Sequence, residues 1–235
     1  MKNLDIRQRR TGFFAFFISG ICAISSGVVV SLLQEELGFA YGTTGTLLAM
    51  MNVGNLAAGF AAAFLAGEMG MKASAVILTA GYLAGYGAMA VFSPIALLMA
   101  AFFLVGIGKG STINTCTILI SDNSRDRTRG MNIMHGCYAL GALLCPFLIS
   151  AAAGVSPRLP MAALAVCGGI LWFAFAATPM GGEKKEKAGG TDWSFLKSGK
   201  FWLLTALLFC QNGTETSVSG WMVTYFQGSG ILTGT

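Results

Sequence analysis

The sequence predicts an all-α fold, a bundle of seven helices that crosses a membrane several times. Three observations support this. Hydrophobic residues make up 54% of the 235 residues and charged residues only 11%, whereas a soluble domain carries about 25% charged residues. Seven apolar stretches have about the 20 residues that a helix needs to cross a bilayer. Of the 15 Lys and Arg residues, 13 lie at the N-terminus or on every second connection between these stretches.

The predicted spans follow one another along the chain at 11–33, 43–66, 74–92, 95–120, 131–154, 160–180 and 201–226. The first is not a cleavable signal peptide, because its apolar run from Gly12 to Leu33 is too long and no small-residue cleavage site precedes polar sequence. We divide the chain into a six-helix bundle (1–180), a polar linker (181–200) and a seventh span that opens a second bundle (201–235). One helix after a linker suggests an incomplete second bundle, so the chain is interpreted as a fragment or a naturally truncated protein.

The basic residues set the expected orientation. The N-terminal group and the bases of the 2–3, 4–5 and 6–7 connections fall on one side, and the other side holds Glu35, Glu36 and a single base, Arg158. Because basic loops stay in the cytoplasm, we expect a cytoplasmic N-terminus in a multi-pass protein of the inner (plasma) membrane. The net charge of +5 therefore reflects orientation and predicts no nucleic-acid partner.

Sequence signatures of catalysis are missing. Gly106-x-Gly-x-Gly110 has no preceding strand and lies inside a span, so it is not a dinucleotide loop. We find no Walker sequence, zinc motif or nucleophile elbow, and we expect no enzyme activity, cofactor or metal. The six cysteines lie inside predicted spans, where we interpret them as packing residues: Cys22, Cys116, Cys137, Cys145, Cys167 and Cys210.

Small residues recur at helix-packing spacing in three spans. They form the rows Gly59, Ala63 and Gly67, then Gly81 and Gly85, then Gly106 and Gly110. Such rows let helix backbones approach closely in lipid, so they predict a tightly packed bundle.

Two charged residues lie near the centres of spans. Lys109 is central in the fourth span and Glu215 in the seventh. A charge at a helix centre costs roughly 2.5–3.5 kcal/mol on insertion scales, so it is tolerated where it faces a wet cavity or a partner charge. We predict that they handle substrate or ions; a Lys109–Glu215 pair that only locks two helices together is the alternative.

Polar side chains also form stripes on two spans. In the seventh, Gln211, Asn212, Glu215 and Ser219 share one helical face, and Trp221 and Tyr225 lie nearer its outer end, either as interfacial aromatics or as a lid. In the fifth, Asn132, His135 and Tyr138 are three residues apart, and His135 either lines a cavity or packs by a hydrogen bond. Asn114 lies about 140° around the fourth span from Lys109, while Asn52 and Asn55 are expected to hydrogen-bond between helices.

These features resemble the major facilitator superfamily of transporters. The resemblance includes the six-span unit, the basic central connection, the loop Ser124-Arg-Asp-Arg-Thr-Arg-Gly130 with Arg129, and the element Gly141-Ala-Leu-Leu-Cys145-Pro146. The stretches around His135 and Glu215 resemble the fucose permease-like branch of sugar:proton symporters.

The sequence also departs from that family. The loop 2–3 signature is reduced to Glu68, Gly70 and Lys72, with the acid displaced by one position; with Arg129, these residues are the expected gating loop. The first span has no acid, where the permease has an Asp involved in proton coupling. Lys109 lies where the permease has a nearby Glu, and a cation would suit an anionic substrate such as a sugar acid at least as well.

The resemblance implies a secondary transporter that works by alternating access on a small polar solute, a sugar or sugar derivative, together with protons. The expected substrate contacts are Lys109, Asn114, His135, Tyr138, Asn212 and Trp221, with Glu215 as the coupling residue. The missing half or a second copy would complete the cavity. The alternatives are a drug or metabolite antiporter and a truncated regulatory protein without transport.

Overall fold

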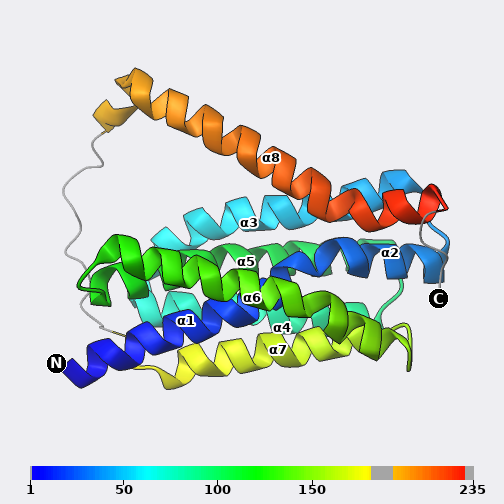
Figure 1. The fold of residues 1–235 in the computed structure, drawn as a ribbon, viewed down its shortest axis with the longest axis horizontal. Coiled ribbons are helices and arrows are strands. Elements are labelled where there is room, and N and C mark those ends of the chain that lie inside the picture. Colours follow the sequence, from blue (N-terminus) through cyan, green and yellow to red (C-terminus); the bar gives the residue numbers. More distant parts are fainter. Residues whose placement is uncertain (1, 181–192, 231–235) are drawn as a thin grey trace. The chain divides into compact units, whose positions relative to one another are not determined.

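The computed structural model describes residues 2–180 and 193–230, which are almost entirely helical (Figure 1). The elements are α1 (Lys2–Ile24), α2 (Ser26–Leu37), α3 (Tyr41–Met69), α4 (Met71–Val91), α5 (Ile95–Asn123), α6 (Arg127–Ala153), α7 (Leu159–Ala177), the 3-10 helix η1 (Trp193–Lys197) and α8 (Gly199–Gly228). The all-α prediction is confirmed. The chain forms two compact units, Met1–Lys184 and Lys185–Thr235; most of the predicted linker, 181–192, lies outside the described residues.

Six helical stretches in the described residues are long and apolar enough to cross a membrane. The first covers α1 and α2 together as Leu4–Leu37, and the others are α3 to α7. The predicted seventh span is the helix α8, but polar residues interrupt its apolar sequence and it is not among the six. Several helices extend beyond the predicted spans, since the 29 residues of α3 are about 44 Å long and the hydrocarbon core is about 30 Å thick.

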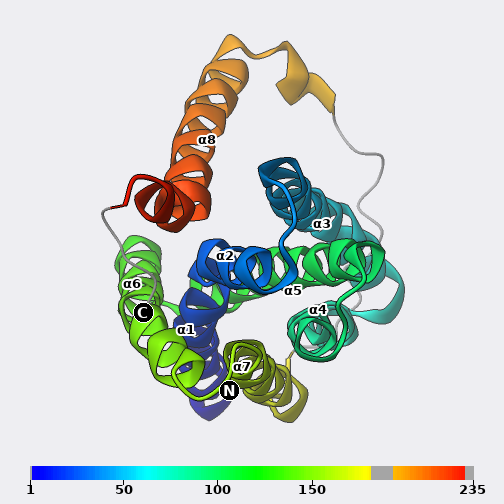
Figure 2. The same cartoon turned by 90° about the vertical axis from the view of Figure 1, so that its right-hand side faces the viewer.

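Two glycine-to-glycine crossings hold the centre of the first unit together. A Cβ on Gly20 of α1 would collide with the backbone of α6 at Tyr138 and Ala142, and a Cβ on Gly141 of α6 would collide with α1 in the same way. The same reciprocal arrangement joins α3 and α5 through Gly54 and Gly106. Figure 2 shows the resulting order, with α6 and α3 on opposite sides of α1 and α5.

The two crossings have the same local geometry. In both, each glycine abuts the residue three before and the residue one after the partner glycine. This is the arrangement expected if the first three spans and the last three form a repeat, with α1 and α6 corresponding to α5 and α3. Such a nested three-plus-three repeat occurs within six-span halves of transporters.

The other close approaches test the predicted rows of small residues. Gly81 and Gly85 of α4 lie against the α5 backbone, and Gly110 of α5 lies against α3, so these rows are confirmed. The row of Gly59, Ala63 and Gly67 is wrong as a packing face, because a Cβ on either glycine would meet nothing within 4 Å. The face that packs is one residue away, a rotation of about 100°, and contains Gly54 and the fully buried Ala58.

The first predicted span is broken at Ser25. In an unbroken helix the amide of Ser26 would donate to the carbonyl of Cys22. Instead, the Cys22 carbonyl accepts hydrogen bonds from the Ser25 hydroxyl at 2.8 Å and from the Tyr86 hydroxyl of α4. The Tyr86 hydroxyl also shares a 2.8 Å hydrogen bond with the Ser25 hydroxyl. Side-chain hydroxyls therefore supply the hydrogen bonds of the Cys22 carbonyl at this break, which contains neither Pro nor Gly.

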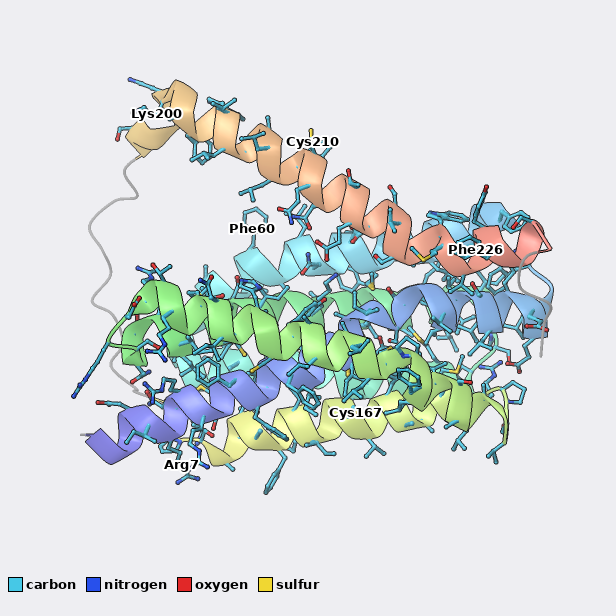
Figure 3. All side chains as sticks on the ribbon, viewed as in Figure 1. Arg7, Phe60, Cys167, Lys200, Cys210 and Phe226 are labelled. Atoms are coloured by element: carbon cyan, nitrogen blue, oxygen red, sulfur yellow. The ribbon has the colours of Figure 1, made fainter. Side chains whose placement is uncertain are left out.

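The six cysteines are free thiols. Three are fully buried (Cys22, Cys116 and Cys145), in keeping with a packing role. Cys210 differs because it is exposed on α8 (Figure 3). Among the described residues, no group of three or more His, Cys, Asp and Glu side chains could hold a metal ion.

Candidate functional site

Lys109 lies at the midpoint of α5, with fourteen residues of the helix on either side. Its side chain is half-buried. The neighbouring Gly106 and Gly110 lie against α3, and Gly108 lies against Tyr82 of α4. The chain on both sides of Lys109 is therefore fixed by backbone contacts with two helices.

Tyr82 connects the part of α5 beside Lys109 with the part of α1 beside the α1–α6 crossing. A Cβ on Gly108 would be 2.7 Å from the Tyr82 nitrogen, while the Tyr82 hydroxyl shares a 3.2 Å hydrogen bond with Ser19 of α1. Ser19 directly precedes Gly20, which crosses Gly141. Tyr82 itself is fully buried, so it packs between α1, α4 and α5.

Polar amides accompany Lys109 on α3 and α5. The Oδ1 atom of Asn55 lies 2.8 Å from the place that a Cβ of Gly110 would occupy, so this amide is at the α3–α5 crossing. Asn114 is half-buried, and Asn52 is exposed. The structure thus brings Asn55, which was expected only to join helices, next to the residue that follows Lys109.

His135 and Tyr138 of α6 share one aromatic neighbour. The ring of Phe16 in α1 lies edge-on to His135, with centroids 5.6 Å apart, and is tilted against Tyr138 at 5.2 Å. Phe16 is buried, Tyr138 is half-buried and His135 is exposed. The predicted stripe is therefore anchored at one side by an aromatic cluster, one turn before the Gly141 crossing.

The remaining predicted contacts belong to the second unit. On α8, the side chains of Asn212, Glu215 and Trp221 are exposed. Ser219 donates a 2.6 Å hydrogen bond to the backbone oxygen of Glu215, and Asn212 bonds at 3.4 Å to the oxygen of Leu208. A pairing of Glu215 with Lys109 joins two units that are described separately, and it stays a prediction.

The expected gating residues lie at the basic end of the first unit, the end that holds the start of α1 and the α3–α4 and α5–α6 connections. Gly70 alone separates α3 from α4, with φ 87°, a conformation that favours glycine. Glu68, Lys72 and Arg129 are exposed on the adjoining turns. No ion pair joins them in the part of the chain that is described, and their gating role stays a prediction.

At the end of the first unit opposite the basic end, Arg158 holds several segments together, a clamp that the sequence did not predict. Arg158 forms a 2.7 Å ion pair with Glu36 of α2 and donates hydrogen bonds to the oxygens of Met89 and Phe92, at 2.6 and 3.0 Å, and to Ser93. It thereby ties the α6–α7 connection to the ends of α2 and α4. The available signal was its isolation, because it is the only base expected on that side.

At the basic end, α1 is tied to the end of α7. Arg7, which Figure 3 labels near the start of α1, donates a 2.9 Å hydrogen bond to the Ala177 oxygen. Gln8 bonds to the Pro179 oxygen at 2.7 Å and Thr11 to Thr178 at 2.9 Å. Both ends of the first unit are thus closed by side-chain bonds between segments far apart in sequence.

Six membrane-length helices in the described residues, with polar side chains at mid-helix, are features that membrane transport proteins share. A profile of the Major Facilitator Superfamily matches residues 12–234. The chain belongs to this superfamily, and it is therefore a multi-pass membrane protein of a secondary transporter family. The comparison with curated proteins gave no match.

Proposed function

We propose that this protein is a secondary active transporter of a small polar solute, a sugar or sugar-derived metabolite, coupled to protons. The observation that supports this is the layer of polar side chains at mid-depth in a superfamily bundle, with Lys109, Asn55 and Tyr138 close to the helix crossings. Polar side chains inside apolar membrane helices occur mostly where they contact a solute or water. The resemblance of the stretches around His135 and Glu215 to the fucose permease-like branch supports the sugar and the proton.

The proposed roles follow from position and chemistry. Asn114, His135 and Tyr138 would hydrogen-bond to the hydroxyl groups of the solute, together with Asn212 and Trp221 of α8. Glu215 would carry the coupling proton, because a carboxyl group in an apolar helix exchanges its proton according to its access to water.

We propose that the basic end faces the cytoplasm, as the positive-inside rule requires, and that the protein lies in the inner (plasma) membrane. Alternating access takes two bundles that rock around a site at the midplane. We therefore propose that the first unit works against a second bundle, supplied by further chain or by a second copy. Glu68, Gly70, Lys72 and Arg129 at the basic end would form the gate.

The test is uptake into proteoliposomes under an imposed inward proton gradient, with radiolabelled hexoses and hexuronates as probes. We expect accumulation that a protonophore abolishes. Glu215→Gln should abolish accumulation against a gradient while retaining exchange of internal for external solute, because the fixed neutral side chain no longer cycles a proton. Unchanged accumulation and exchange in this variant would exclude the coupling role.

An antiporter is the second candidate, supported by the element from Gly141 to Pro146. This element includes the α1–α6 crossing and the proline inside α6, and elements of this kind recur among antiporters of the superfamily. Vesicles loaded with solute distinguish the two functions: loss of solute against an inward proton gradient supports export, and accumulation supports symport.

A further inference from the structure

The helices α1 and α6 lie side by side and run in the same direction (Figure 2). Near their starts, both pack against the side chain of Ile120 in α5. A Cβ on Gly12 of α1 would be 2.9 Å from its Cγ1 atom, and a Cβ on Gly130 of α6 would be 3.2 Å from its Cγ2 atom. One turn further along, Phe16 contacts His135. The first turns of α1 and α6 are therefore level with each other at the basic end.

Each of the two helices presents an exposed arginine at this level. Arg10 lies two residues before the apolar run of α1, and Arg129 lies two residues before the predicted fifth span. Four residues after each arginine, and thus on the same helical face, is an exposed apolar side chain. These side chains are Phe14, which is 46% exposed, and Ile133, which is 45% exposed. Each helix therefore has a base at the edge of its apolar segment and an apolar surface one turn further in.

Both pairs lie on the same side of the two helices. Measured from Gly20 and Gly141, where the helices face each other, the pair of α1 is about 80–120° around its helix in one sense and the pair of α6 about 80–120° in the opposite sense. In parallel neighbours, opposite rotations lead to the same side. Phe16 and His135 have the reversed senses of rotation, and their rings meet on the other side. We name the surface that results the α1–α6 patch, and it consists of Arg10, Phe14, Arg129 and Ile133.

The charge around this patch is positive. The segments 4–12 and 121–130 contain six arginine and three aspartate residues, a net charge of +3. The carboxylate of Asp126 accepts a 3.0 Å hydrogen bond from the Arg129 amide, which caps α6. In the part of the chain that is described, neither Arg10 nor Arg129 forms an ion pair. Exposed guanidinium groups bind phosphate by paired hydrogen bonds, so the patch suits a phosphate group attached to an apolar chain.

We propose that the α1–α6 patch binds an anionic phospholipid. Arg10 and Arg129 hold its phosphate, and the acyl chains lie along Phe14 and Ile133. Packed helices are about 8–10 Å apart, a separation that two arginine side chains bridge around one phosphate. Basic residues next to a membrane span attract anionic lipids, whereas a zwitterionic lipid adds a cation that the arginines repel. This inference is independent of the proposed solute and of proton coupling.

The experiment titrates the purified full-length chain in detergent with palmitoyl-oleoyl phosphatidylglycerol and with the phosphatidylcholine that has the same acyl chains. Native mass spectrometry measures the bound lipid. The main variant combines Arg10→Gln with Arg129→Gln. Its matched control combines Lys197→Gln with Lys200→Gln, which removes the same charge from two exposed lysines of the second unit (Figure 3). Thermal unfolding without added lipid shows that each variant is folded.

We expect the wild type to bind phosphatidylglycerol about thirtyfold more tightly than phosphatidylcholine, which is equivalent to about 2 kcal/mol for two bases beside an anionic lipid. The paired arginine variant should lose most of this preference, and the paired lysine variant should keep it. Equal binding of the two lipids by the wild type, or a preference that survives the loss of both arginines, would overturn the proposal. A preference that the lysine variant loses to the same extent would show attraction by overall charge, and the patch would again be excluded.

Two further arms test the acyl chains. Phe14→Ala should weaken the binding of both lipids by about fivefold, because part of the aromatic surface is lost, while Phe64→Ala, at a side chain 69% exposed on α3, should change neither. Equal effects of these two variants would contradict the acyl-chain contact. Glycerol phosphate, which has the phosphate without acyl chains, should not displace phosphatidylglycerol even in large excess. Displacement would show a site for a soluble phosphate and overturn the lipid proposal.

Discussion

Gly85 and Gly87 of α4 should respond differently to substitution by alanine, which adds a single methyl group to the helix. A Cβ on Gly85 would be 2.6 Å from the Ala101 oxygen and 2.6 Å from Cγ2 of Val105, whereas ordinary contact begins at 3.4 Å. A Cβ on Gly87 would meet nothing within 4 Å. We therefore expect Gly85→Ala to force α4 away from α5 and Gly87→Ala to be accommodated.

The magnitude follows from the missing space. The Ala101 backbone must move by roughly 0.8 Å, and a gap of about 0.5–1 Å forfeits a quarter to a half of the dispersion attraction of each contact. Overpacking of this kind costs about 1–3 kcal/mol. Alanine also favours a helix interior over glycine by about 0.8–1 kcal/mol, but this gain is common to both variants and cancels in their comparison.

Thermal unfolding in detergent micelles measures the difference. At about 2–4 °C per kcal/mol for a chain of this length, Gly85→Ala should unfold roughly 2–12 °C below Gly87→Ala. Protein and detergent concentrations are held equal, and wild type is scanned beside both. If Gly85→Ala unfolds at or above the temperature of Gly87→Ala, the helix approach described for α4 and α5 is wrong.

Other predictions concern the hydrogen bonds to the Cys22 carbonyl and those that Arg158 makes. Tyr86→Phe removes a buried hydroxyl that donates to the Cys22 carbonyl, and we expect a loss of about 1–3 kcal/mol; an unchanged unfolding temperature would refute the role of Tyr86 in the helix break. Glu36→Gln removes only a partly exposed ion pair and should cost less than about 1 kcal/mol, with a smaller effect in high salt. Arg158→Gln also removes bonds to the carbonyl oxygens of Met89 and Phe92, so it should lower the unfolding temperature further than Glu36→Gln, and the reverse order would contradict the clamp.

The packing rows show what spacing in the sequence does and does not determine. Gly81 with Gly85 and Gly106 with Gly110 were predictable because small residues four apart let two backbones meet. The same spacing was misleading at Gly59 and Gly67. Spacing identifies a smooth face but not the face that a neighbouring helix covers, and in α3 the pair at 54 and 58 provides an equally smooth face beside it.

The features that were missed depend on partners distant in sequence. Ser25 is neither proline nor glycine, and the break after α1 is stabilised by Tyr86, 61 residues further along. In the sequence, Arg158 is an isolated basic residue of a loop. Its partners at the ends of α2 and α4 become apparent only in the fold. Lys109 and Glu215 could be selected from sequence because a charge in an apolar run is conspicuous without knowledge of its partner.

The crossings also connect stability with the proposed transport. Tyr138 lies three residues before Gly141, Asn55 directly follows Gly54, and Lys109 lies three residues after Gly106. Near a glycine crossing the two backbones have no room to slide, so side chains within one turn of it are held in place. Binding groups work best when their support is rigid. The same glycine crossings that pack the first unit together therefore also hold the residues to which we assign binding.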